Sequence, residues 1–431
     1  MTRVQLVRKN AHEVAFAIKA EESARQAVVA GIPHSTTSAV RNCLSVPTMA
    51  ETPTRPARIL CLDGGGVKGV ATLQILKEIM TAVNQQQQTR GQDTPASQGG
   101  IKPCDYFDLI CGTSTGGLIA LMLGRLEFTV DDAIQKYKQL ANDIFKKETA
   151  FSWNAKYDHK PLERKLKEVI SDSGSPLRLD ENALLVDNNR PCKSFVVTTN
   201  LTSHSAKPVL LRAYETEFEV EPINKKPVKI WEAGRATSAA PTFFGPYKME
   251  DGLEYTDGGT IANNPTELGY QEASRLWQSR KIDLIVSIGT GPEKDLTLSS
   301  ATEEFISPCW LRVLKGVLPR TYFFRLQLAM YSVKAMTNTE RPHERVQGNI
   351  NTFQGITSAS AAAAPFPRIY FRLNIEDKSA LVQLDACDKM DHLMKLAKDY
   401  INQRSQERDQ IATILLKTEV GDQDGLTLPP A

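Results

Sequence analysis

Short apolar runs alternate with helix-like patterns through the middle of the chain. Runs with the length and composition of buried strands are ARILCLD (57–63), YFDLICGTS (106–114), KSFVVTTN (193–200), PVLLRAYE (208–215), EYTDGG (254–259, running into a turn) and KIDLIVSIGTG (281–291). Segments with apolar positions at helical spacing, or with helix start signals, are residues 69–83, 115–126, 129–147 and 229–240. Strands that alternate with helices predict an α/β fold with three layers (α/β/α), in which helices cover both faces of a central, mostly parallel sheet.

The two ends of the chain differ in character from this middle part. Residues 1–55 join an Ala-rich helical stretch to a linker rich in Ser, Thr and Pro, and we expect them to be an extension outside the fold. Residues 56–292 are the predicted core domain. Residues 293–431 are mainly helical in pattern apart from RIYFRLN (368–374), and we expect them to complete or flank that domain. A Gln-rich polar stretch, residues 84–100, is predicted to be a loop.

Composition and charge narrow the class of protein. With 52 Lys and Arg against 50 Asp and Glu, the net charge of +2 neither favours nor excludes nucleic acid as a partner. No uninterrupted apolar stretch reaches the roughly 18 residues that a membrane-spanning helix needs, so we expect a soluble protein. The seven cysteines are scattered and form no CxxC pair, which is typical of a protein in a reducing, cytoplasmic compartment.

The glycine-rich stretch CLDGGGVKGV (61–70) follows a predicted strand and precedes a predicted helix. Bare backbone in that position presents N–H groups to an anion. The glycine spacing fits the dinucleotide fingerprint GxGxxG. The acid that the fingerprint needs after a second strand is missing, because Asp93 sits in the Gln-rich loop. A phosphate-binding P-loop would need Gly-Lys followed by Ser or Thr. The nucleotide interpretation therefore stays a minor alternative.

A second glycine cluster, GTSTG (112–116), changes this interpretation. It fits the motif G-x-S-x-G between a predicted strand and a predicted helix, which is the setting of a nucleophile elbow. Ser114 would then project its hydroxyl from the strand end as a nucleophile, with a tight structural turn as the alternative. Attack on a carbonyl creates an oxyanion that needs aimed N–H donors, and the loop at 64–66 can supply them.

A serine nucleophile also needs a base. Asp257 lies in YTDGG (255–259), where a strand end turns on two glycines, and a plain Asp-Gly turn is the alternative. A triad in the order Ser, acid, His would use a histidine after Asp257, and only His343 and His392 follow it. His343 lies in a charged segment and His392 in an amphipathic helical pattern, so neither has a recognisable catalytic setting.

Five short motifs, taken in order, resemble the patatin family of lipid acyl hydrolases. They are DGGGVKG (63–69), GTSTG (112–116), SAAPTFF (238–244), DGG (257–259) and NNP (263–265). The resemblance covers residues 56–292 and implies a patatin-like fold with a Ser–Asp dyad and no histidine. Ser114 would be the nucleophile and Asp257 the base. By position in the glycine loop, Gly65 and Gly66 would be the oxyanion donors.

The other motif positions would support this machinery. They are Gly64, Lys68, Gly69, Gly112, Gly116, Gly258 and Gly259. The basic position of the glycine loop is often Arg in the family and is Lys68 here. Lysine keeps the charge but lacks the planar fork of Arg, which leaves a bidentate role for this position open.

The resemblance also implies a reaction. The protein would hydrolyse fatty-acyl esters through an acyl-enzyme, independently of calcium and without a metal or cofactor. Its substrates would be membrane phospholipids, lysophospholipids, galactolipids or neutral acylglycerols, and no nucleic-acid partner is expected. A catalytically inactive lipid-binding protein on the same fold is the alternative.

Residues 305–339 contain no Asp or Glu but combine aromatic with basic side chains. Such a mixture suits an anionic lipid surface. The alternative is a pair of helices that turns its basic face to solvent. We therefore expect a cytoplasmic protein that associates peripherally with membranes, and the sequence predicts no oligomeric state.

Overall fold

An eight-stranded sheet forms the centre of the protein. The computed structural model describes residues 55–91, 100–145, 156–172, 176–202, 207–216, 218, 226–241, 243–278, 280–292, 339–353 and 369–417. The strands are β1 (Ala57–Leu62), β2 (Leu109–Thr113), β3 (Lys193–Asn200), β4 (Pro208–Arg212), β5 (Tyr247–Lys248), β6 (Glu254–Asp257), β7 (Ile282–Ile288) and β8 (Tyr370–Leu373). Their order across the sheet is β5-β6-β3-β2-β1-β7-β8, with β4 paired to β3.

The strand directions are mixed, with the parallel pairs in the middle. The pairs β2–β3, β1–β2, β1–β7 and β7–β8 are parallel. The pairs β3–β4, β3–β6 and β5–β6 are antiparallel and lie toward one end of the sheet. The prediction of a mostly parallel central sheet is therefore confirmed.

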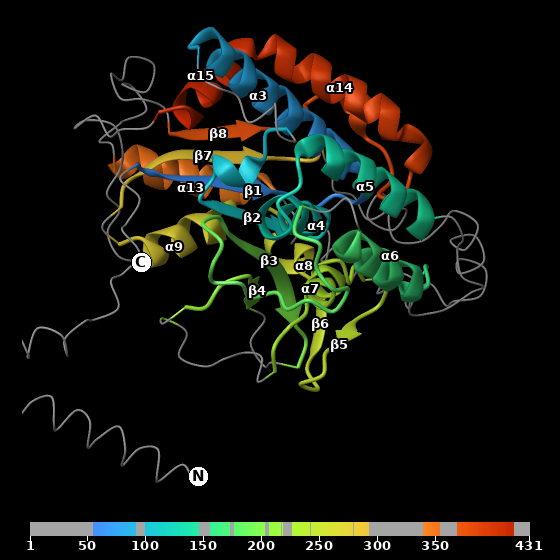
Figure 1. Cartoon of the computed structure of the whole chain (residues 1–431). Helices are drawn as coiled ribbons and strands as arrows, with labels where there is room; N and C mark the ends of the chain where they lie inside the picture. The colour runs from blue at the N-terminus through green and yellow to red at the C-terminus, as the bar shows by residue number, and fades with distance from the viewer. Residues whose placement is uncertain are drawn as a thin grey trace, which may run out of the picture. The chain divides into compact units, whose positions relative to one another are not determined.

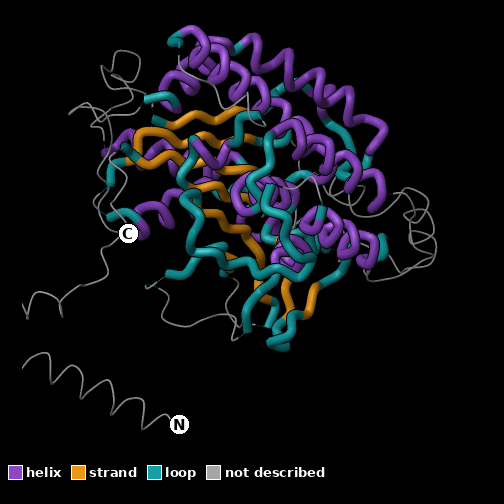
Figure 2. Tube along the Cα trace, in the orientation of Figure 1, coloured by secondary structure: helices purple, strands orange, loops and turns teal. Residues whose placement is uncertain are grey.

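Helices cover both faces of this sheet (Figure 1; Figure 2). One face is covered by α3 (Gly69–Thr89), α4 (Thr115–Ala120), α5 (Val130–Ile144), α6 (His159–Ser171), α7 (Ile230–Thr237), α14 (Met390–Gln403) and α15 (Ser405–Leu415). The opposite face carries α9 (Thr266–Leu276) and α13 (Glu340–Phe353), and a short helix, α8 (Gly259–Ala262), follows β6. This arrangement confirms the predicted three-layer α/β/α fold.

The burial of strand β1 shows why the sequences of the central strands are continuous apolar runs. All six of its residues are buried. Leu60 and Leu62 belong to the core under the larger helical layer, whereas Ile59 and Cys61 belong to the core under α9 and α13. A parallel strand that is covered on both faces has no polar side, so its sequence shows no alternation.

Helix α3 is longer than the sequence pattern predicts. Residues 84–89, expected to begin a polar loop, form its last turns, so the loop prediction is wrong for this part. Glutamine is a good helix former. Gln86 is also held by α15, because its Nε2 donates to Asp409 O at 3.0 Å and its Oε1 accepts from Thr413 Oγ1 at 3.0 Å.

The helix predicted at 129–147 begins as its start signal indicates. Thr129 is the N-cap of α5, and its Oγ1 accepts a hydrogen bond from the N–H of Asp132 at 3.2 Å. This contact satisfies one of the free N–H groups of the first turn. A side-chain cap that is readable from sequence therefore fixes the start of the helix, whereas the described part of the helix ends at Ile144.

The C-terminal part of the chain adds to both the sheet and its covering layer. Strand β8 pairs with β7, and α14 and α15 pack on α3. All described residues belong to one compact unit, Thr54–Ala431. Residues 1–54 and 293–338 lie outside the described residues, so the N-terminal extension, the domain boundaries and the basic, aromatic segment before Thr339 stay predictions. Among the described helices, none has the length and apolarity needed to span a bilayer.

Candidate active site

Ser114 occupies a sharp turn between β2 and α4. Its φ of 53° and ψ of −123° are angles that a residue with a side chain rarely adopts, and they are typical of a nucleophile elbow. The two motif glycines make the turn possible: a Cβ on Gly112 would overlap the carbonyl of Gly116, and a Cβ on Gly116 would overlap the carbonyl of Leu62. The N–H of Ser114 donates to Thr237 Oγ1 at 2.9 Å, which anchors the strained residue.

Asp257 lies beside this serine at the end of β6. Its Oδ2 accepts a hydrogen bond from Ser114 Oγ at 2.6 Å, and its Oδ1 accepts one from the N–H of Gly259 at 2.7 Å. The carboxyl is only 4% exposed. Burial raises the pKa of Asp257 from 3.8 to about 7, and the two hydrogen bonds oppose that rise. A carboxyl with this pKa is partly ionised near neutral pH and can accept a proton from a hydroxyl.

The turn after Asp257 depends on its glycine neighbour. A Cβ on Gly258 would overlap the carbonyl of Val197 in β3. The chain can therefore bend close to β3 and return the N–H of Gly259 to the carboxylate. The DGG motif thus holds the orientation of the acid through its own backbone.

The glycine loop after β1 lies next to the nucleophile. A Cβ built on Gly64 would stand 3.1 Å from Ser114 Cβ. The N–H groups of Gly64 and Val67 donate to backbone carbonyls elsewhere in the domain, at 3.2 and 2.8 Å. Between them, the N–H groups of Gly65 and Gly66 have no acceptor in the described part of the chain. Two neighbouring donors beside Ser114 therefore stay available to a ligand.

The two motif positions after this loop are buried. Lys68 ends the short 3₁₀ turn Gly66–Lys68 and is 8% exposed. A Cβ on Gly69 would overlap the side chain of Thr115. The start of α3 can therefore approach the start of α4, and the basic position of the loop lies inside the domain instead of on its solvated surface.

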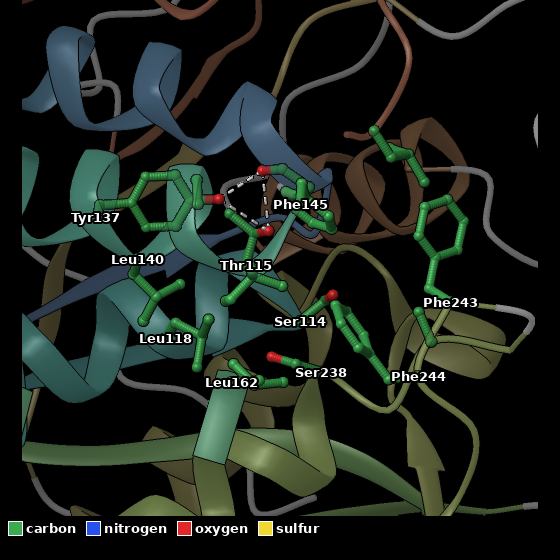
Figure 3. Close-up of a pocket in the computed structure, with 15 residues that line it drawn as sticks. Ser114, Thr115, Leu118, Tyr137, Leu140, Phe145, Leu162, Ser238, Phe243 and Phe244 are labelled. Carbon is green, nitrogen blue, oxygen red and sulfur yellow. Dashed lines mark hydrogen bonds between the residues drawn. The ribbon is translucent and has the colours of Figure 1, made fainter. Parts of the chain in front are cut away.

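An apolar pocket opens beside Ser114 (Figure 3). Its volume is about 530 Å³, including the part open to solvent. The wall is formed largely by aliphatic and aromatic side chains, among them Leu118 of α4, Leu140 and Ile144 of α5, and Leu162 of α6. A pocket of this composition fits a hydrocarbon chain attached to the atom that the serine attacks.

A buried ion pair fixes the strand end before the glycine loop. Asp63 accepts from Arg372 of β8 at 2.7 Å, and both side chains are buried. Arg372 also donates to Glu340 and Ser287, each at 2.9 Å. The pair joins the ends of β1 and β8, and its opposite charges balance each other. Within the described ranges, no three His, Cys, Asp or Glu side chains lie close enough together to hold a metal.

Two of the described histidines have other partners, and a third is exposed. His343 Nδ1 lies 2.9 Å from the hydroxyl of Tyr370, His392 is exposed on α14, and His159 pairs with Glu163 at 2.8 Å. Among the residues that the structure describes, no histidine is hydrogen bonded to the carboxyl of Asp257. The described hydrogen bonds of the Asp257 carboxyl are those with Ser114 and Gly259.

Several supporting residues were not predicted from the sequence. Thr237 holds the backbone of Ser114, and the carbonyl of Ala239 accepts the N–H of Asp257 at 3.0 Å. Tyr137 and Thr290 donate to carbonyls of the glycine loop. Ala239 lies in the SAAPTFF motif, and Thr290 follows the carboxyl end of β7, where side chains of an α/β sheet gather. Tyr137 carries no such signal, because it is one of several buried positions on α5.

Comparison with known proteins is consistent with this site. The family model for the patatin-like phospholipases matches residues 60–270. The chain is 33% identical over 298 residues to "Phospholipase A I" of Arabidopsis thaliana, covering 56% of this chain and 21% of that protein. It is 27% identical over 373 residues to "Calcium-independent phospholipase A2-gamma" of Oryctolagus cuniculus, covering 84% and 40%.

A bacterial relative is covered more fully. The chain is 31% identical over 263 residues to the "cGAMP-activated phospholipase" of Vibrio cholerae serotype O1, and the match covers 56% of this chain and 67% of that protein. The chain spans much less of the plant and rabbit relatives, about a fifth and two fifths of their lengths. The matched residues include the elbow, the glycine loop and the aspartate. The chain therefore belongs to the patatin-like phospholipase family.

Proposed function

We propose that this protein is a serine acyl hydrolase that cleaves fatty-acyl esters of phospholipids or related glycerolipids. Ser114 is the nucleophile, Asp257 the base, and the reaction passes through an acyl-enzyme. The observation that carries the proposal is the 2.6 Å hydrogen bond from Ser114 Oγ to the buried carboxyl of Asp257, at the side of an apolar pocket.

The reaction begins with proton transfer. The ionised carboxyl of Asp257 takes the proton of Ser114 Oγ as Oγ bonds to the ester carbon, and the carbonyl oxygen becomes an oxyanion. When the tetrahedral intermediate collapses, the bond to the leaving alkoxide breaks and that oxygen takes the proton from Asp257. Water then repeats the sequence: it gives a proton to Asp257, attacks the acyl carbon and releases the fatty acid. Ser114 Oγ recovers the proton.

The free N–H groups of Gly65 and Gly66 are the proposed oxyanion donors. They lie in the loop beside Ser114 and have no acceptor in the described domain. Such donors act mainly in the transition state, because the carbonyl oxygen carries its full charge only then. Neither donor requires a metal, so we expect hydrolysis to proceed without calcium.

The names of the relatives favour phospholipids among the possible substrates. Three related proteins are phospholipases by name, and one of them is called calcium-independent. We propose a phospholipid in a membrane surface as the substrate and a cytoplasmic protein that acts at that surface. The apolar pocket supports this choice, because it would hold the acyl chain while the polar headgroup stays outside.

An inactive lipid-binding protein is the competing proposal. A protein that has lost its activity usually has substitutions among the catalytic residues. Here the nucleophile, the base and the glycines of both loops are present together, and the base has a pKa near the physiological range. These features favour an active enzyme.

The test is hydrolysis by the purified full-length chain. The substrates are p-nitrophenyl fatty-acyl esters and phosphatidylcholine vesicles with different acyl chains at the two positions, with released fatty acids identified by mass spectrometry. Ser114→Ala should be inactive, whereas Ser274→Ala, a serine on α9 that donates to Tyr270 O, should retain the wild-type rate. A wild-type protein that binds the vesicles but releases no fatty acid would establish the lipid-binding alternative.

A further inference from the structure

The carbonyls on either side of the free N–H pair are both held by side chains. Along the chain the order is the Gly64 carbonyl, the Gly65 N–H, the Gly65 carbonyl, the Gly66 N–H and the Gly66 carbonyl. The Gly65 carbonyl accepts a hydrogen bond from the N–H of Lys68 at 3.2 Å. The Gly64 carbonyl accepts a hydrogen bond from Thr290 Oγ1 at 3.1 Å. The Gly66 carbonyl accepts one from the hydroxyl of Tyr137 at 2.6 Å. Two side chains from distant elements therefore hold the two ends of this short segment.

Thr290 helps to set the orientation of the first donor, and Asn263 Nδ2 donates to the same Gly64 carbonyl at a longer distance, 3.4 Å. The carbonyl of Gly64 and the N–H of Gly65 belong to one planar trans peptide group, so they point in opposite directions. A hydrogen bond that fixes the carbonyl therefore also fixes the N–H. The side chain of Thr290 packs directly against this group, because a Cβ on Gly65 would overlap Thr290 Oγ1. Thr290 is itself buried, at 5% exposed, so it has little freedom to move.

Tyr137 holds the other end of the segment. Its hydroxyl is buried between α5 and the loop, and burial raises the pKa of the phenol above its usual value, so it stays a hydrogen-bond donor. Thr115 Oγ1 donates to the same carbonyl at 3.0 Å, and Figure 3 shows the hydroxyls of Tyr137 and Thr115 close together. Gly66 has a φ of 57°, a left-handed conformation that glycine adopts readily. Its carbonyl shares a peptide group with the N–H of Val67, so Tyr137 acts on the Gly66 N–H through the backbone of Gly66 and not within one peptide plane.

We propose that Thr290 and Tyr137 are positioning residues that aim the N–H groups of Gly65 and Gly66 at the developing oxyanion. This inference rests on the proposed function. Neither side chain would touch the reacting atoms. Thr290 lies beyond residues 60–270, the part matched by the family model, so the family pattern gives it no role. Because the donors act on charge that develops during the reaction, loss of their aim lowers kcat and leaves KM almost unchanged.

The test removes each hydroxyl while keeping the shape of the side chain. Thr290→Val and Tyr137→Phe should each lower kcat by about tenfold or more, with KM within about twofold of wild type. Thr290→Ser keeps a hydroxyl and should recover most of the lost rate. Thr81→Val is the control, because Thr81 Oγ1 makes the same kind of hydrogen bond, to Lys77 O at 2.8 Å, at an exposed position of α3.

A second measurement distinguishes a changed orientation of the N–H groups from a general loss of structure. An alkyl trifluoromethyl ketone bonds to Ser114 Oγ and, as Asp257 takes the serine proton, places a full negative charge on its own oxygen. Its affinity should fall in Thr290→Val by about the same factor as kcat/KM. The pH at which activity is half-maximal should not move, because the base is untouched. Thr290→Val should still unfold in one cooperative thermal transition, so that its lower affinity is that of a folded protein.

Four results would overturn the inference in an active enzyme. They are a folded Thr290→Val or Tyr137→Phe with wild-type kcat, a Thr290→Ser as slow as Thr290→Val, a Thr81→Val equally slow, or an unchanged affinity for the ketone. If the wild-type protein hydrolyses no ester, the proposed function fails and this inference fails with it. If the wild type is active and the variants have wild-type rates, only the positioning role is rejected and the proposed function stands.

Discussion

Asp257 provides a sharp test of the site, because its pKa affects both stability and activity. The carboxyl has an ordinary pKa of 3.8 when exposed and a pKa of about 7 when folded. Between these pH values the native carboxyl holds a proton that the unfolded chain has lost. The free energy of unfolding must therefore fall as the pH rises, by about 1.4 kcal/mol per pH unit for this one group. Over roughly three units the loss reaches about 4 kcal/mol, and it is complete above the folded pKa.

Asp257→Asn removes this titration with little change of shape. The amide oxygen can still accept the N–H of Gly259, and the amide nitrogen can donate to Ser114 Oγ. We expect the variant to be inactive but more stable than wild type at neutral pH. Its stability advantage should grow by about 2 kcal/mol between pH 5 and pH 7 and level off about one pH unit higher. Urea unfolding of both proteins at several pH values measures this difference directly.

The pH dependence of activity should follow the same ionisation of Asp257. Only the ionised carboxyl can accept the serine proton, so log kcat/KM of the wild type should rise with unit slope up to about pH 7 and then become constant. Ser114→Ala removes a hydrogen bond that lowers the pKa of Asp257, so its stability should fall over a window that extends to higher pH. A stability advantage of Asp257→Asn that does not change with pH, together with activity that stays flat down to about pH 5, would refute a burial-raised pKa.

Three further outcomes are expected. Ser114→Ala and Asp257→Asn should each reduce the hydrolysis rate by roughly a thousandfold or more. The double variant should be little slower than either, because the two groups act as a unit. His343→Ala and His392→Ala should keep near wild-type rates if circular dichroism shows them folded. Full activity should persist in excess EDTA, and activity that is lost and then restored by added calcium would contradict the metal-free mechanism. Ala141→Phe should fill part of the apolar pocket and shift the preference toward shorter acyl chains, which a series of p-nitrophenyl esters from butanoyl to palmitoyl would measure.

The sequence predicts the fold where local patterns are strong. Buried strands such as β1 appear as apolar runs, and the N-cap Thr129 marks the start of α5. The Gln-rich end of α3 was missed because its helical state depends on contacts with α15. Helix α6 was also missed, although Leu162, Leu166, Val169 and Ile170 repeat at helical spacing. The antiparallel pairing of β4 and β6 with β3 is a long-range property that no local pattern contains.

In the candidate site too, the sequence predicts the residues that lie in local motifs and misses those that act through long-range contacts. The motifs indicate Ser114, Asp257 and the glycine loop because these positions need particular residue types. The residues that hold them are ordinary ones in long-range contacts. Thr290 and Gly64, for example, are 226 residues apart, and a threonine hydroxyl bonded to a carbonyl has no sequence signature. Only the folded arrangement shows which of the many threonines and tyrosines contact the loop.

The proposed dyad without histidine also gives a reason for the firm hold on the glycine loop. Transfer of the serine proton to Asp257 moves one negative charge from the carboxyl to the ester oxygen and adds no charge to the pocket. Burial that raises the pKa of Asp257 makes this transfer easier, because the neutral acid is favoured in an apolar environment. The same apolar environment would disfavour the oxyanion unless fixed donors receive it. In the proposed mechanism, the buried carboxyl at the end of β6 and the anchored N–H groups after β1 are therefore complementary. Proton transfer to the carboxyl moves the negative charge to the substrate, and the N–H groups stabilise it there.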